Sequence, residues 1–151
     1  MPVEKLKQFL DDNKIKYVVI RHSLAYTAQQ IAASAHIPGK DLAKTVMIKA
    51  DGRMAMVVLP ASVKVDLDHV KTAIHANSVS VASERDFKDA FPGCELGAMP
   101  PFGNLYGMDV FVHELLAKDT EIAFNAGSHT ELIRMAYDDY QRLVSPKMIS
   151  S

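Results

Sequence analysis

The 151-residue chain lacks the features that mark several large classes of protein. It has a single cysteine, Cys94, so it can form no disulfide within the chain and no zinc site built from several cysteines. No apolar run approaches the ~20 residues that a membrane-spanning helix needs. The charged N-terminal stretch MPVEKLKQFLDDN is also unlike a secretory signal peptide. These absences predict a cytoplasmic protein that does not bind membranes.

A strong net charge is missing as well. The formal net charge is -1, which argues against extended contact with a nucleic-acid duplex, because such contact needs many phosphate partners. The charges are nevertheless uneven: residues 1–71 have 11 Lys and Arg against 7 Asp and Glu, a net +4, and residues 72–151 have 6 against 11, a net -5. The N-terminal half is therefore the expected side for a phosphate, although an uneven solvated surface would give the same counts.

The short motifs of common catalytic and metal sites are also absent. Neither G-x-S-x-G nor a P-loop occurs. The six histidines have no recognised ligand spacing, since even His69 and His75 are too far apart to share one helical face. Cys94 has no neighbouring Lys, Arg or His in the sequence that would activate it as a nucleophile. We therefore expect neither a metal nor another cofactor.

What the chain does have is an alternation of helical and strand patterns typical of one α+β (mixed α/β) domain over residues 1–151. An Asp51-Gly52 pair between two apolar-rich runs predicts a central hairpin. Asp66 or Asp68 is expected to cap a helix, as is Ser83 with Asp86. The expected helices are 2–13, 29–37, 68–76, 84–91 and 138–144, and the expected strands are 16–22, 44–50, 53–60, 108–114, 121–126 and 131–136.

A long irregular segment, residues 93–107, contains four of the seven glycines and the adjacent prolines Pro100 and Pro101. Prolines restrict the backbone, whereas glycines let it approach a ligand closely. Such a stiff loop is typical of a cradle for an anion or oxyanion, formed by backbone N–H groups. A surface turn stiffened for stability is the alternative.

Two polar residues stand at positions suited to a site. His129 follows Gly127-Ser128 in a turn between two expected strands, and Lys44 opens an apolar strand. A lone histidine is often structural, and a lysine at a strand end often only reaches into solvent. In the functional alternative, Lys44 holds a phosphate or a terminal ribose at the mouth of a pocket.

Taken together, these segments resemble the YbaK/prolyl-tRNA-synthetase-associated editing family, whose members hydrolyse mischarged aminoacyl-tRNA. The resemblance covers nearly the whole chain and implies a mixed β-sheet or partial barrel surrounded by helices. Three motifs in their order and spacing carry it: Lys44-Thr45 at a strand start, the GxxxPxG loop Gly97-x-x-x-Pro101-x-Gly103, and the Gly-x-His turn Gly127-Ser128-His129 of the alanine-editing branch.

The resemblance implies a hydrolase that cleaves the ester between an amino acid and the terminal ribose of tRNA. Loop N–H groups would stabilise the negative charge on the carbonyl oxygen, and water ordered by the substrate's own hydroxyl would attack. The implied catalytic residues are Lys44, Gly97, Pro101, Gly103 and His129. The implied substrate-binding residues are Gly127, Ser128 and four pocket-wall candidates that would serve equally well in a core, Tyr26, Val46, Met99 and Phe102.

The match to the Gly-x-His turn of the alanine-editing branch implies a small substrate, so the expected reaction is deacylation of Ala-tRNA(Pro). A second sieve of this kind admits alanine and excludes the larger proline. The expected partner is the acceptor end of tRNA(Pro), with a synthetase or elongation factor as a further partner. The alternatives are a deacylase for cysteine, serine or threonine, and a non-catalytic module that binds aminoacyl-tRNA or a synthetase.

Overall fold

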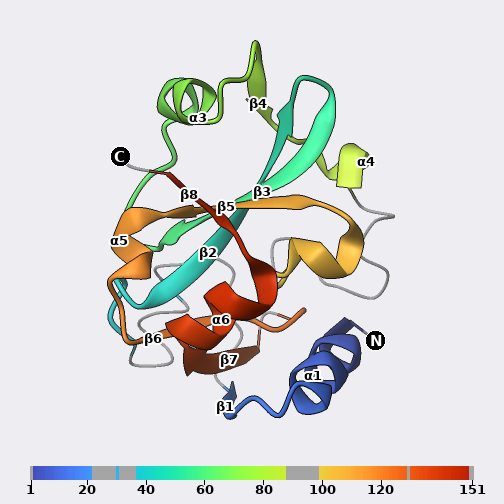
Figure 1. Ribbon diagram of the computed structural model, residues 1–151, viewed down its shortest axis with the longest axis vertical. Coiled ribbons are helices and arrows are strands. Elements are labelled where there is room, and N and C mark those ends of the chain that lie inside the picture. The colour runs from blue at the N-terminus through green and yellow to red at the C-terminus, as the bar shows by residue number, and fades with distance from the viewer. Residues whose placement is uncertain (1, 22–29, 31–36, 88–98, 129, 150–151) are drawn as a thin grey trace.

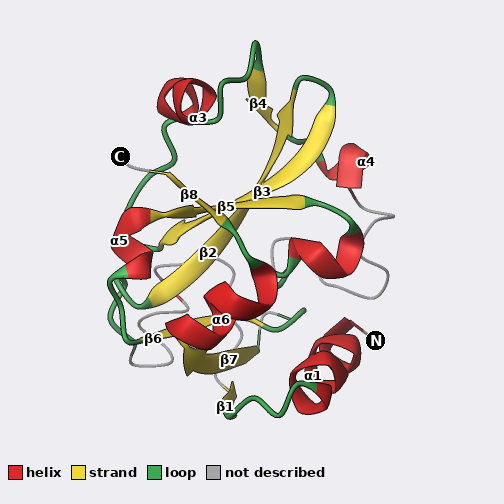
Figure 2. Cartoon of the chain, viewed as in Figure 1, coloured by secondary structure: helices red, strands yellow, loops and turns green. Residues whose placement is uncertain are grey.

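One mixed β-sheet organises the computed structural model, which describes residues 2–21, 30, 37–87, 99–128 and 130–149 (Figure 1; Figure 2). Within these residues eight strands pair in the order β1-β7-β6-β2-β3-β5-β8, and β4 pairs with β2. The strands are β1 (Tyr17–Arg21), β2 (Leu42–Ala50), β3 (Arg53–Pro60), β4 (Val79–Val81), β5 (Asp109–His113), β6 (Glu121–Asn125), β7 (Glu131–Ala136) and β8 (Lys147–Ile149). The helices are α1 (Pro2–Asp12), α3 (Leu67–Ala73), α4 (Glu84–Phe87), the 3-10 turn η1 (Gly103–Tyr106), α5 (Glu114–Ala117) and α6 (Tyr137–Val144). This mixed α/β architecture confirms the expected fold class.

The central hairpin of β2 and β3 forms where the Asp-Gly pair predicts it. Asp51 and Gly52 have φ angles of 50° and 83°, the left-handed conformation that a two-residue hairpin turn requires. The Asp51 carboxylate also accepts hydrogen bonds from the backbone N–H groups of Asn77 and Ser78, at 3.0 and 2.9 Å. The turn is thereby tied to the segment that leads into β4.

Strand β2 has a gap in its pairing. One edge pairs with β3 from Ala43 to Ala50. The other edge pairs with β6 at Leu42 and Ala43 and with β4 from Ile48 to Ala50. In the described part of the chain, no strand pairs with residues 44–46 on this second edge. We call this stretch the β2 gap.

The two faces of the sheet have different coverings. The main core contains side chains from α1, α6 and η1, together with Ala43 and Met47 of β2. A second cluster on the opposite face joins Ile48 and Val46 of β2 to Val70 of α3. Because side chains alternate along a strand, Lys44 shares the face of Val46 and Ile48. In Figure 1, α3 accordingly lies well away from α1 and α6.

Most expected elements are confirmed, with three kinds of difference. The helix expected at 29–37 lies almost wholly outside the described residues, as does the second half of the helix expected at 84–91. Asp66, not Asp68, caps α3, because its side chain accepts the N–H of His69 at 3.2 Å. The expectations missed β4, β8, α5 and η1, which are elements of three or four residues.

Gly103 yields a prediction about stability. A Cβ at this position would lie 2.7 Å from Val110 Cγ2 and 2.8 Å from the carbonyl oxygen of Met108. The backbone must therefore move, and we expect Gly103→Ala to lower the free energy of unfolding by about 1–3 kcal/mol. Gly39→Ala is the matched control, because its Cβ would make only ordinary contacts with Ser62, the nearest at 3.5 Å. Denaturant unfolding of both variants checks this, and equal stabilities would contradict it.

Candidate functional site

Lys44 lies at the β2 gap, on the face opposite the main core. It pairs with Leu59 of β3 and is half-buried. Partial burial, followed by repulsion from nearby Lys64, lowers the pKa of the Lys44 ammonium group below its usual value. Among the described residues no carboxylate forms an ion pair with Lys44. A partly desolvated cation beside a second cation is well suited to attract an anion or a developing negative charge.

Asn125 is the last residue of β6 and follows Phe124, where the pairing of β6 with β2 ends. The parallel pairing of β2 and β6 sets Ala43 opposite Phe124, so the next residues along, Lys44 and Asn125, point to the same face. The Asn125 Oδ1 atom is buried, and no described group donates a hydrogen bond to it. A buried acceptor without a donor is costly unless a ligand supplies one.

The turn between β6 and β7 follows Asn125 directly. Gly127 has a φ angle of 104°, which a residue with a side chain rarely adopts. The N–H of Ala126 donates to the carbonyl oxygen of Glu131 at 3.1 Å and closes the turn. Within it, the hydroxyl oxygens of Ser128 and Thr130 are 3.3 Å apart. The fold therefore brings Gly127 and Ser128 to the end of β6, next to the β2 gap with Lys44 and Val46.

Sequence reasoning missed Asn125. A single asparagine at the end of an apolar strand belongs to no recognised catalytic motif. The signal that could have indicated a site residue was its position. Asn125 is a polar residue that directly follows the apolar run Ile122–Phe124 and comes just before the turn at Gly127.

The proline-rich loop is anchored in the main core, as far as the structure describes it. Phe102 is fully buried, with its ring centroid 5.4 Å from that of Phe124 and 5.3 Å from that of Tyr140. The Tyr140 hydroxyl donates a buried hydrogen bond to the Pro101 carbonyl oxygen at 2.7 Å. The Phe102 N–H donates to the Pro100 carbonyl oxygen at 2.8 Å. This N–H is therefore used within the loop, and the loop is stiff, as the prolines predict.

This packing bears on three of the site candidates. Met99 and Phe102 belong to the main core, on the face opposite Lys44, so their burial favours the core role over a place in the pocket wall. A side chain at position 103 would collide with Val110 and Met108. This crowding explains why the residue is a glycine, and no close approach of a ribose is needed to explain it. Three other site candidates, Tyr26, Gly97 and His129, lie outside the described residues.

A carboxyl pair lies at the start of β2. Burial, together with the charge and hydrogen bond of Asp41, raises the pKa of Asp119 from its usual 3.8 to about 6. The Asp119 Oδ2 atom is buried and has no hydrogen-bond partner in the described part of the chain. Two adjacent carboxyl groups cannot both ionise without repulsion.

Neither a metal cluster nor a membrane helix is found in the described ranges. No group of three His, Cys, Asp or Glu side chains is placed there to hold a metal ion. No helix there is long and apolar enough to cross a bilayer.

Comparison with known proteins identifies the family of the chain. A family model described as an aminoacyl-tRNA editing domain matches residues 22–143. The Multifunctional Ser/Thr-tRNA deacylase ProXp-y of Escherichia coli K12 is 29% identical over 113 residues, which cover 72% of this chain and 67% of that protein. The corresponding protein of Escherichia coli O157:H7 matches equally well.

Solved structures share the fold at low sequence identity. A candidate trans-editing enzyme for prolyl-tRNA synthetase superposes with a TM-score of 0.83 at 15% identity, over 99% of this chain and 95% of that one. A hypothetical protein superposes with a TM-score of 0.84, also at 15% identity, over 97% of each chain. The chain belongs to the aminoacyl-tRNA editing domain family. It is a hydrolase that acts on the ester bond of aminoacyl-tRNA.

Asp119 yields a prediction about pH. Its raised pKa means that the folded state binds the proton more tightly than the unfolded state between about pH 4 and 6, so this carboxyl lowers stability as the pH rises through that window. We expect Asp119→Asn to be more stable than the parent at pH 7 by roughly 1 kcal/mol, allowing for solvent screening of a partly exposed group. Thermal unfolding at pH 4 and pH 7 measures the effect. A variant with an unchanged pH dependence would contradict it.

Proposed function

We propose that the chain is a trans-acting deacylase that hydrolyses mischarged Ala-tRNA(Pro). The observation that carries this proposal is that the half-buried Lys44 and the buried Asn125 oxygen, which has no donor among the described residues, each come one position after the paired residues of β2 and β6. These two groups offer a positive charge and an acceptor on the same face of the sheet. An aminoacyl ester bears the complementary features, which are a carbonyl oxygen that becomes negative during hydrolysis and an α-ammonium group that donates hydrogen bonds.

In the proposed reaction, water attacks the ester carbonyl carbon and the carbonyl oxygen becomes an oxyanion. The attacking water gives up a proton, the bond between the carbonyl carbon and the ribose oxygen breaks, and the released ribose oxygen takes up a proton to become a hydroxyl group. Lys44 stabilises the negative charge at the ribose end of the substrate. Asn125 Oδ1 accepts a hydrogen bond from the α-ammonium group and thereby sets the orientation of the amino acid. The substrate's neighbouring hydroxyl orders the water.

The Gly97–Gly103 loop has a supporting role in this proposal. The Tyr140 hydroxyl holds the carbonyl oxygen of Pro101, so the described end of this loop is fixed to the main core. We assign to Gly97 the role of a backbone N–H donor to the oxyanion, and one such donor is typically worth ~10²–10³ in rate.

Substrate choice is assigned to the turn Gly127-Ser128-His129, with Val46 and Tyr26 as further walls. The imidazole of His129 makes the amino-acid pocket too small for proline. Deacylation of Ser-tRNA or Thr-tRNA is the second candidate, and similarity to a Ser/Thr-tRNA deacylase favours it. The proposed partner is the acceptor end of tRNA(Pro), with a synthetase or elongation factor delivering it in the cytoplasm.

Lys44→Ala tests the charged contact. We expect its single-turnover deacylation rate to fall by about 10- to 100-fold, because a hydrogen bond to a charged group contributes roughly 1.5–3 kcal/mol. Lys49→Ala is the matched control on the same strand, since Lys49 contacts Asp86 at 3.3 Å on the surface. We expect the control to keep the parental rate. Equal rates for the two variants would remove Lys44 from the site.

Asn125→Ala tests the second group with two substrates. Propionyl-tRNA(Pro) matches Ala-tRNA(Pro) but has no α-ammonium group. We expect the variant to lose about tenfold or more in rate on the alanyl ester and less than about twofold on the propionyl ester. Equal losses on both esters would show that Asn125 has a structural role only, because a general distortion of the site does not depend on the ammonium group.

A further inference from the structure

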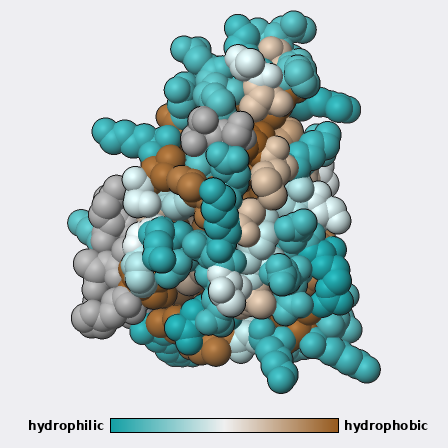
Figure 3. Space-filling view, turned by 60° about the vertical axis from the view of Figure 1, so that its left-hand side comes forward, coloured by the Kyte–Doolittle hydropathy of each residue, from teal (hydrophilic) through white to brown (hydrophobic). Residues whose placement is uncertain are grey.

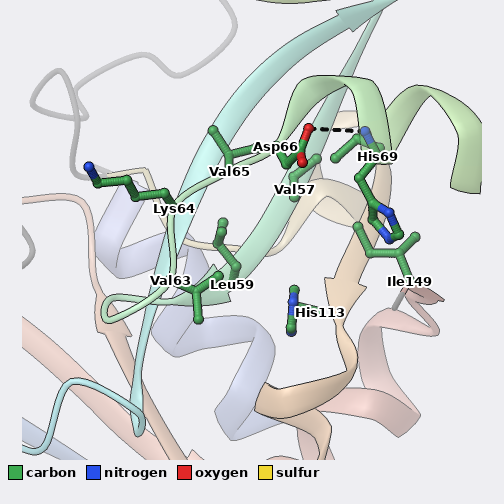
Figure 4. Close-up of a pocket in the computed structure, with 10 residues that line it drawn as sticks. Val57, Leu59, Val63, Lys64, Val65, Asp66, His69, His113 and Ile149 are labelled. Carbon is green, nitrogen blue, oxygen red and sulfur yellow. Dashed lines mark hydrogen bonds between the residues drawn. The ribbon is translucent and has the colours of Figure 1, made fainter. Parts of the chain in front are cut away.

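A second polar site lies on the same face of the sheet as Lys44. It is a pocket of about 110 Å³ under α3, between β3, β5 and β8 (Figure 4). Its walls are mainly aliphatic, and four side chains bring polar atoms to it. The lining residues are Val57, Leu59, Val63, Val65, Val70 and Ile149, with Lys64, Asp66, His69 and His113. In the space-filling view of this side of the molecule, hydrophobic side chains are visible between hydrophilic ones (Figure 3).

His113 supplies a hydrogen-bond donor to this pocket. Its Nδ1 atom accepts the N–H of Leu115 at 3.1 Å, so in the neutral ring the proton is on Nε2. Burial lowers the pKa of His113, which keeps the ring neutral. The residue is 5% exposed, and its Nε2 atom has no hydrogen-bond partner among the described residues. The pocket therefore contains a buried N–H group that lacks an acceptor.

Two charged residues of the pocket stand away from this donor. The Asp66 carboxylate lies toward the other end of the pocket in Figure 4. It accepts one hydrogen bond from the His69 N–H and retains capacity for another. The Lys64 side chain extends outward from the pocket. A ligand with a ring acceptor at one end and an amino group at the other matches the first two groups, and an attached phosphate matches the third.

The pocket adjoins a row of side chains that crosses adjacent strands, namely Lys44, Leu59 and His113. Lys44 pairs with Leu59, which lines the pocket. The parallel pairing of Val58 with Val112 makes Leu59 and His113 neighbours on adjacent strands. Adjacent strands are about 4.8 Å apart, so the backbones of Lys44 and His113, which are separated by two strand spacings, are about 10 Å apart. One nucleoside has a comparable length.

We propose that this pocket binds the adenine of the terminal nucleotide of tRNA while the ester lies at Lys44. The aliphatic walls pack against the flat ring, and His113 Nε2–H donates to a ring nitrogen. The exocyclic amine donates to Asp66, and Lys64 contacts the 5′-phosphate. This assignment rests on the proposed deacylase function, because that function supplies the reason for a nucleotide at this distance from Lys44.

Titration of the intact protein with AMP and with ribose 5-phosphate tests the assignment. AMP has the sugar, phosphate and base of the terminal nucleotide, whereas ribose 5-phosphate lacks the base. We expect AMP to bind at least about tenfold more tightly and to shift the ring resonances of His113 in NMR spectra. Equal affinities, or an unmoved His113 signal, would overturn the assignment.

Three variants locate the bound base. Val63→Phe fills the pocket, and we expect it to reduce AMP affinity to that of ribose 5-phosphate. His113→Asn keeps an acceptor for the Leu115 N–H and should weaken AMP binding about two- to tenfold without changing ribose 5-phosphate binding. Lys64→Gln should weaken both ligands. Each variant is first checked for a parental unfolding transition, and AMP binding insensitive to Val63→Phe would place the base elsewhere.

The two proposals fail in different ways. A protein that binds AMP in this pocket but hydrolyses no aminoacyl-tRNA would overturn the deacylase proposal alone. A protein that hydrolyses aminoacyl-tRNA at an unchanged rate in Val63→Phe, with AMP binding no better than ribose 5-phosphate, would overturn the adenine pocket alone.

Discussion

The pairing of strand β2 is the constraint on which the rest of the structure depends. β2 pairs with β3 on one edge and with both β6 and β4 on the other, and it leaves residues 44–46 without a strand partner in the described part of the sheet. The gap stands where Lys44 is half-buried and where β6 ends at Asn125. The proposed deacylase site therefore lies at the gap in the pairing of β2.

The two faces of the sheet are covered by different side chains. On one face α1, α6 and the anchored loop build the main core, in which Phe102 and Tyr140 are fully buried. On the other face the row that includes Lys44, Leu59 and His113 combines apolar packing with polar groups that lack partners among the described residues. Buried polar atoms left unsatisfied are costly to the fold. His113 Nε2 and Asn125 Oδ1 are two such atoms among the described residues, and a ligand on this face would complete their hydrogen bonds.

Local patterns predicted most of the architecture because their causes are local. The Asp51-Gly52 hairpin follows from turn geometry, and the cap at Asp66 follows from the chemistry of a helix start. The short strands β4 and β8 could not be predicted in this way, because three residues pair only where another strand offers an edge. Phe102 was ambiguous for a related reason, since an aromatic residue in a glycine-rich loop has the same sequence signature in a core and in a pocket. The roles of Asn125 and His113 depend on neighbours in other strands, so no spacing in the sequence reveals them.

The most direct measurement is single-turnover deacylation by the intact protein of tRNA(Pro) charged with alanine, serine, threonine or proline. The account predicts rapid hydrolysis of the alanyl ester and stability of the prolyl ester. Preferential hydrolysis of the seryl and threonyl esters would contradict the alanine assignment while leaving the Lys44 site in place. Failure to hydrolyse any of the four esters would contradict the central claim that the β2 gap is a deacylase site.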